Sequence, residues 1–117
     1  MPKIETLKLN KDFKRLYGRG KSFVHPVLVT YIMRNRTGYC RIGITTGKKV
    51  GNAVERNRAR RVILAAFRQL LPEITGGYDL VFVARSKTPF VKSTDICKVL
   101  EKQLKEAGAI KIEMVAD

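Results

Sequence analysis

The chain has 117 residues, with 24 Lys and Arg against 10 Asp and Glu, a formal net charge of +14 and an apolar fraction of 44%. This length predicts one domain with one core, and this apolar fraction argues against a wholly disordered chain. A cationic excess of this size opposes folding by self-repulsion, so it indicates a polyanionic partner.

Segments for export and membrane insertion are not recognisable in the sequence. No run approaches the ~18 apolar residues of a membrane span, and the N-terminus lacks the apolar core of a secretion signal. The two cysteines, Cys40 and Cys97, have neither zinc-site spacing nor a CxxC pattern. We therefore expect a cytoplasmic protein in which both cysteines are small buried hydrophobes.

The first half of the chain predicts one short helix and two strands. Asn10 is a candidate N-cap for a helix over residues 11–19, which glycines end. Pro26 restricts pairing at the start of the next apolar segment, so a strand is expected over residues 27–33. After a turn, alternation of apolar and polar residues predicts a second strand over residues 39–46. We expect these two strands to form an antiparallel hairpin.

The second half of the chain predicts a helix, a strand and a helix. A long helix is expected over residues 53–71, and the continuous apolar run 78–84 is typical of a central strand. A last helix is expected from residue 93 or 94 to 107, with Gly108 as the residue that ends it. The tail, residues 109–117, has no predicted partner.

Residues 48–61 are strongly basic and lead directly into an apolar helical stripe. Six of the fourteen residues are Lys or Arg, and Glu55 is the one acidic residue. On a helical wheel the arginines flank the first turns on both sides, so these turns are expected to extend past the sheet. The apolar face consists of Ala59, Val62, Ile63, Ala66, Phe67 and Leu70. A helix N-terminus with free N–H groups also favours phosphate. The alternative is an ordinary solvated basic face.

Aromatic and basic residues also occur together near the N-terminus. Phe13 and Tyr17 are one helical turn apart among Lys and Arg, and Tyr31 lies in the middle of a predicted strand. Aromatic planes framed by cations suit single-stranded nucleic acid, because every base has a face that can stack. Spacing by itself leaves open the alternative that Phe13 and Tyr17 fill the core.

Catalysis by the chain itself has little support. His25 is the one histidine, so no histidine pair exists for acid–base cleavage of RNA, and the carboxylates are scattered rather than clustered. We expect His25 to be a turn or surface residue.

Three segments together resemble a known family. The run KKVGNAVERNRARRVILAAFR resembles the signature of the protein subunit of bacterial ribonuclease P, LKLNKDFKRLYGRGKS resembles its opening helix, and YDLVFVAR resembles a later strand. The resemblance covers about residues 5–108, so the expected RNA-binding domain is 1–108. It implies a single α+β domain of order α-β-β-β-α-β-α, similar to a domain of a ribosomal protein, with an unusual left-handed βαβ crossover. The third strand before the long helix is expected in the basic loop or as a continuation of the second.

The resemblance also implies a function. The protein would assist a catalytic RNA that removes 5′ leaders from precursor tRNA, with Mg²⁺ required by the complex and no metal ligand or catalytic residue in this chain. Contacts to the catalytic RNA would fall on Lys48, Lys49, Asn52, Arg56, Asn57, Arg58, Arg60, Arg61 and Arg68. The single-stranded leader would bind in a cleft formed by Phe13, Tyr17 and Tyr31, flanked by Arg41 and Arg85. The alternative is a ribosomal-type structural RNA-binding protein with no role in cleavage.

Overall fold

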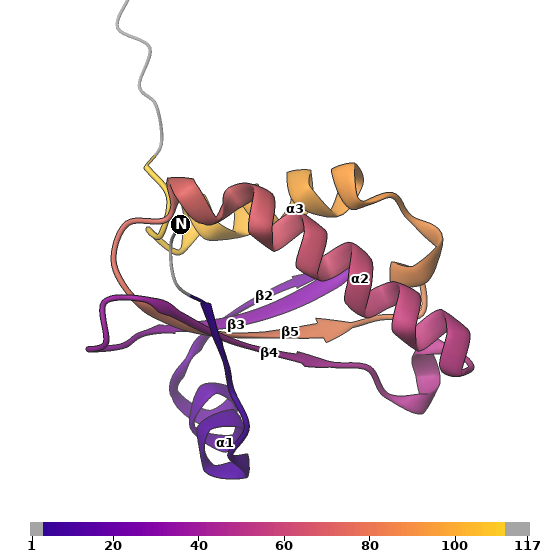
Figure 1. Ribbon diagram of the computed structural model, residues 1–117, viewed down its shortest axis with the longest axis horizontal. Helices are drawn as coiled ribbons and strands as arrows, with labels where there is room; N and C mark the ends of the chain where they lie inside the picture. Colours follow the sequence, from indigo (N-terminus) through magenta and orange to yellow (C-terminus); the bar gives the residue numbers. More distant parts are fainter. Residues whose placement is uncertain (1–3, 112–117) are drawn as a thin grey trace, which may run out of the picture.

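A five-stranded mixed sheet separates one small helix from two larger ones (Figure 1). The computed structural model describes residues 4–111. Figure 1 shows α2 and α3 on one face of the sheet and α1 on the other. The strands are β1 (Ile4–Thr6), β2 (Lys21–His25), β3 (Leu28–Arg34), β4 (Cys40–Thr45) and β5 (Tyr78–Ala84). The helices are α1 (Asn10–Arg19), α2 (Ala53–Leu70) and α3 (Ser93–Glu106), with short 3₁₀ turns η1 (Lys48–Val50), η2 (Leu71–Glu73) and η3 (Thr88–Phe90).

The strand order is β1-β4-β5-β3-β2, which places β5 at the centre. β5 pairs in parallel with β4 and antiparallel with β3, so α2 is the crossover between two neighbouring parallel strands. The predicted hairpin between residues 27–33 and 39–46 is therefore wrong. Those strands run antiparallel, but β5 lies between them and takes the hydrogen bonds of both.

The third strand of the expected order lies earlier than either expected position. It is β2, which forms a hairpin with β3 through a turn at Pro26 and Val27. Proline has no N–H to give to a ladder, and here it occupies the turn instead of starting a strand. His25 is the last residue of β2, next to the turn where it was expected, and its Nδ1 accepts a hydrogen bond from the Val27 N–H at 3.2 Å. The short strand β1, which pairs in parallel with β4, was not expected.

The main core lies between the sheet and the helices α2 and α3. Ala59, Ile63, Ala66 and Phe67 are completely buried and Leu70 nearly so, which confirms the predicted apolar face of α2, with Val62 partly exposed at its edge. Cys40 and Cys97 are buried and unbonded to each other, as expected. Burial raises the pKa of both thiols.

The predicted start of α2 and the predicted end of α3 agree with the structure, and the predicted start of α1 does not. α2 begins after Asn52, and Gly108, with a φ of 81°, follows the last turn of α3 as predicted. The N-cap of α1 is Leu9 rather than Asn10, and Leu9 makes no side-chain cap. Among residues 4–111, no helix is long and apolar enough to cross a membrane.

The beginning of the C-terminal tail packs against the domain. Ala109 and Ile110 are buried, and Ile110 forms a bridge with Ile74. Residues 112–117 lie outside the described part of the chain.

Candidate RNA-binding surface

The first turns of α2 extend past the sheet. No residue of α2 before Ala59 is buried, and in Figure 1 this end of the helix reaches beyond the arrowheads of β4 and β5. This agrees with the expectation from the helical wheel. Among the predicted basic contacts here, Arg56 is half-buried. The others are exposed: Lys48, Lys49, Arg58, Arg60, Arg61 and Arg68.

A capping box fixes the start of this helix. The Asn52 side chain accepts from the Glu55 N–H at 2.9 Å, and the Glu55 carboxylate accepts from the Asn52 N–H at 3.0 Å. Gly51 has a φ of 141°, and a side chain there would collide with Glu55. The one carboxylate of the basic run therefore caps the N-terminus of α2. Asn52, a predicted RNA contact, is also the N-cap residue of this helix, a role that the sequence analysis did not assign to it.

The cations of this region have almost no partners within the protein. The exception in the described chain is Arg60, whose Nη1 donates to the Ile44 carbonyl at 3.2 Å and ties the helix flank to β4. The side chains of Arg58 and Arg61 form no ion pair or hydrogen bond with any other residue of 4–111, and Asn57 beside them is exposed. A dense set of uncompensated guanidinium groups next to a helix N-terminus is well suited to phosphate.

The predicted aromatic residues lie together between α1 and the opposite sheet face. Tyr17 and Tyr31 make an edge-to-face contact, with ring centroids 4.9 Å apart and an interplanar angle of 83°. Tyr17 is 44% exposed, and Tyr31 is half-buried. Phe13 packs against Gly43, where an added Cβ would overlap its ring. Phe13 is thus partly a core residue, while Tyr17 is available at the surface.

This sheet face is only partly covered by α1. A small second core of Leu7, Leu16 and Val81 holds the helix in place. Around it, Met33 and Val83 remain half-buried and Val24 is 71% exposed. The result is a partly open apolar floor beside two tyrosines.

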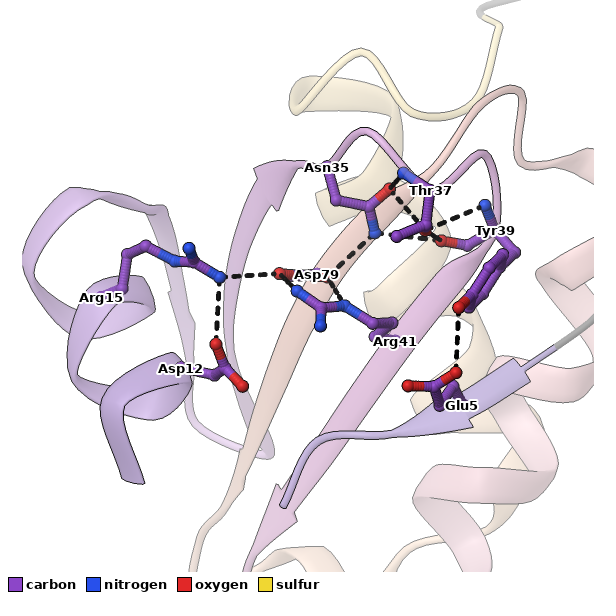
Figure 2. Close-up of polar contacts among 8 residues, drawn as sticks. All are labelled: Glu5, Asp12, Arg15, Asn35, Thr37, Tyr39, Arg41 and Asp79. Atoms are coloured by element: carbon purple, nitrogen blue, oxygen red, sulfur yellow. Dashed lines mark hydrogen bonds and ion pairs between the residues drawn. The ribbon is translucent and has the colours of Figure 1, made fainter. Parts of the chain in front are cut away.

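Arg41 and Arg85, the two predicted flanking residues, differ in their contacts. The Arg41 Nε and Nη2 donate to the two carboxylate oxygens of Asp79 at 2.8 and 2.6 Å, so its guanidinium is committed to the sheet (Figure 2). Arg85 is exposed just after β5, where its backbone N–H donates to Thr88 Oγ1 at 2.7 Å.

Asp79 is the centre of a polar network that joins α1 to the sheet. Asn35 donates to it at 2.9 Å, and Arg15 of α1 lies 3.5 Å from it while also pairing with Asp12 (Figure 2). Burial would raise the pKa of the Asp79 carboxyl, but the hydrogen bonds from Arg41 and Asn35 and the nearby positive charges outweigh it and lower that pKa. Beyond a single carboxylate in an apolar run, no pattern in the sequence indicated this network.

The fold and these two surfaces define a basic α+β domain suited to a polyanion, and comparisons with known proteins identify the family. The Ribonuclease P family model matches residues 1–108. The ribonuclease P protein component of Clostridioides difficile (strain 630) is 44% identical over 100 residues, which are 85% of this chain and 88% of that protein. The chain belongs to the family of ribonuclease P protein components, and this membership implies an RNA partner and a part in tRNA processing.

Solved structures agree with this assignment. The RNase P protein of Staphylococcus aureus is 33% identical, with a TM-score of 0.79 over 93% of this chain and 100% of that chain. The RNase P protein from Thermotoga maritima is 30% identical, with a TM-score of 0.76 over 94% and 99%. The expected α+β fold and its element order are therefore confirmed, with β1 as an added strand.

Proposed function

We propose that this protein is the cofactor of a catalytic RNA in ribonuclease P. It binds that RNA through the basic end of α2 and binds the single-stranded 5′ leader of precursor tRNA between α1 and the sheet. The RNA carries out the endonucleolytic step that leaves the mature 5′ end, and the protein by itself is inactive. The reaction takes place in the cytoplasm.

Binding of the catalytic RNA is supported by the state of the α2 cations. All of them except the half-buried Arg56 are exposed, and the capping box engages the carboxylate of Glu55, the one acidic residue of the basic run. Each phosphate that they neutralise releases counterions, so association should weaken steeply as salt rises.

Leader binding is supported by one observation above all, the exposed Tyr17 in contact with Tyr31 over a half-open apolar sheet face. Stacking of a base on an aromatic side chain contributes about 1–3 kcal/mol and tolerates any base, as a leader of variable sequence requires. A structural RNA-binding protein of the ribosomal type would need the basic helix but not this cleft.

We assign no Mg²⁺ ligand to this chain, although the complex requires the ion. The carboxylates of Glu55 at the start of α2 and of Asp79 beneath α1 are already engaged, Glu55 in the capping box and Asp79 with Arg41. Mg²⁺ prefers oxygen ligands and keeps several waters, and RNA phosphates supply such a setting.

The test is whether the assembled complex discriminates precursor from mature tRNA through Tyr17. Tyr17→Ala should reduce the ratio of the affinity for precursor tRNA to that for mature tRNA by about 5- to 150-fold, the equivalent of one stacked base. Tyr17→Phe should retain this ratio. Phe90→Ala is the matched control, because Phe90 is also an exposed aromatic, at 71%, but lies on η3 away from the cleft. An unchanged ratio in Tyr17→Ala would favour the structural RNA-binding alternative.

A further inference from the structure

The face of α1 that points away from the sheet is basic. Its residues line a shallow hollow of about 600 Å³: Lys11, Lys14, Arg15, Gly18 and Arg19. On a helical wheel at about 100° per residue these positions lie opposite Phe13 and Leu16, which pack toward the sheet. The one acidic residue of α1, Asp12, is 7% exposed and does not line the hollow. We call this surface the outer face of α1.

Three of the four cations on this face are not compensated by the protein. The exposed side chains of Lys11, Lys14 and Arg19 form no ion pair or hydrogen bond with any other residue of 4–111. Arg15 differs, because it pairs with Asp12 and belongs to the network beneath α1. Like charges three and four residues apart destabilise a helix, so this face favours an anionic partner that relieves the repulsion.

Gly18 lies in the middle of the outer face, where the fold does not require a glycine. Its φ is not positive, and a Cβ added there would meet no other part of the protein within 4 Å. A Cβ at Gly20 or Gly43 would instead collide with neighbouring atoms. Glycine destabilises a helix relative to alanine, because it loses more backbone freedom on folding. The gap among long cationic side chains therefore gives no benefit within the protein, but it lets an outside group approach the helix backbone closely.

We propose that the outer face of α1 binds the sugar–phosphate backbone of the catalytic RNA, at a segment different from the one that the basic end of α2 binds. The inference rests on the proposed function and adds a second surface to it. Figure 1 shows α1 and α2 on opposite faces of the sheet, so the protein lies between the two RNA segments. A fixed gap at Gly18 suits a folded RNA, whose backbone has one shape at that place, better than a leader of variable sequence. Phosphate contacts carry no base identity, so this surface positions the protein on the RNA without reading its sequence.

Equilibrium binding of this protein to a bacterial ribonuclease P RNA, with no tRNA present, tests the proposal. Lys11→Gln with Lys14→Gln and Arg19→Gln, the α1 variant, should weaken binding about tenfold, as three exposed ion pairs provide. The slope of log K against log salt should become shallower by about 0.7–0.9 for each phosphate that the variant no longer neutralises. Glutamine favours helix and the three positions are exposed, so Tm should stay unchanged.

Gly18→Gln separates close approach from charge. It fills the gap while every charge stays in place, and its Tm should stay the same or rise, because glutamine has the higher helix propensity. Binding to the RNA should nevertheless weaken by about fivefold, the equivalent of one or two phosphate contacts. A position with a purely structural role would not combine unchanged or increased stability with weaker binding.

Two further variants make the result specific. Lys92→Gln with Lys98→Gln and Lys102→Gln, the α3 variant, removes the same charge from exposed positions at and before α3 and should bind the RNA nearly as wild type does. Arg58→Ala with Arg61→Ala weakens the contact at α2. In hydroxyl-radical protection of the RNA, it should expose a segment different from the one that the α1 variant exposes.

Four results would overturn the proposal. The α1 variant could bind the RNA as wild type does while the α2 variant does not, which would leave the proposed function intact. The α1 variant could bind the RNA normally and lose affinity for tRNA in the assembled complex, which would assign the face to tRNA. The α3 variant could lose as much affinity as the α1 variant, which would make the effect one of net charge. Gly18→Gln could bind as wild type does, which would mean that no RNA backbone lies close to the helix. A wild-type protein that does not bind the RNA at all would instead contradict the proposed function.

Discussion

Replacement of Asp79 by Asn tests whether the buried network holds α1 against the sheet. The Asp79 side chain is 2% exposed and receives two hydrogen bonds from Arg41 and one from Asn35. Removal of one partner from a buried ion pair costs about 3–5 kcal/mol, and because the Arg41 side chain is 22% exposed and Asn keeps one acceptor, we expect about 2–3 kcal/mol. At about 4 °C per kcal/mol for this chain length, Tm should fall by about 8–12 °C.

The pH dependence gives an independent check of the same variant. The pKa of Asp79 is lowered by folding, so its contribution is present above the ordinary value of 3.8 and is lost as pH falls through the folded pKa. The gap in stability between wild type and Asp79→Asn, measured by urea unfolding, should therefore be constant near neutral pH and close below pH 3.8. When Arg41→Gln is added to both proteins, the difference in stability between them should also shrink, because Asp79 then lacks its ion-pair partner.

Glu101→Gln is the control for a surface ion pair. Glu101 accepts from Lys105 at 2.8 Å, and the Lys105 and Glu101 side chains are 36% and 40% exposed, so we expect a loss of at most about 0.5 kcal/mol. If Asp79→Asn were equally mild, or if its deficit persisted unchanged at low pH, the network would not stabilise α1 as argued.

Three further substitutions examine the other surfaces. Arg58→Ala with Arg61→Ala should weaken salt-dependent binding to the catalytic RNA while leaving Tm nearly unchanged, because both side chains are exposed; a Tm loss of about 10 °C would contradict their placement. Phe67→Ala should cost about 3–5 kcal/mol in urea unfolding, since its ring is 0% exposed, and near-neutral stability would mean that this stripe is not core. Gly43→Ala should cost about 1–3 kcal/mol by overlap with Phe13, with partial relief from an added Phe13→Leu; additive losses in the double variant would show that the two positions are independent.

Local patterns predicted the elements more reliably than their pairing. The α2 helix was predicted within one residue because the loop that Gly51 ends precedes it and Pro72 follows it closely. The strand β2 was missed because proline is tolerated at the first residue of a strand, whereas Pro26 belongs to the hairpin turn. β1 is three residues long, too short for a period of two to be recognised.

Contacts between distant parts of the chain were beyond local reasoning. The short connection between β3 and β4 favoured a hairpin, yet β5, which follows only after the whole of α2, lies between them. In the same way, Asp79 stands alone among apolar neighbours because its partner Arg41 is 38 residues away. The resemblance placed Arg41 beside the leader cleft, but it could not show that the guanidinium is held by a carboxylate.

The exposure of the candidate RNA-binding side chains was predictable only in part. An excess of arginines on the first turns of α2 was predictable, since Glu55 is the one acidic residue among them. The split between Phe13, half in the core, and Tyr17, at the surface, depended on Gly43, whose missing side chain admits the Phe13 ring. The sequence does not indicate that a glycine on a distant strand will pack against Phe13.

Cleavage of precursor tRNA at low Mg²⁺ tests directly whether this protein is the cofactor of a catalytic RNA. The reaction is run with this protein, with a bacterial ribonuclease P RNA, and with both together. We expect cleavage at the mature 5′ end in the mixture, with none from rigorously purified protein. Cleavage by the protein without RNA, or no stimulation of a matched RNA by the protein, would contradict this expectation.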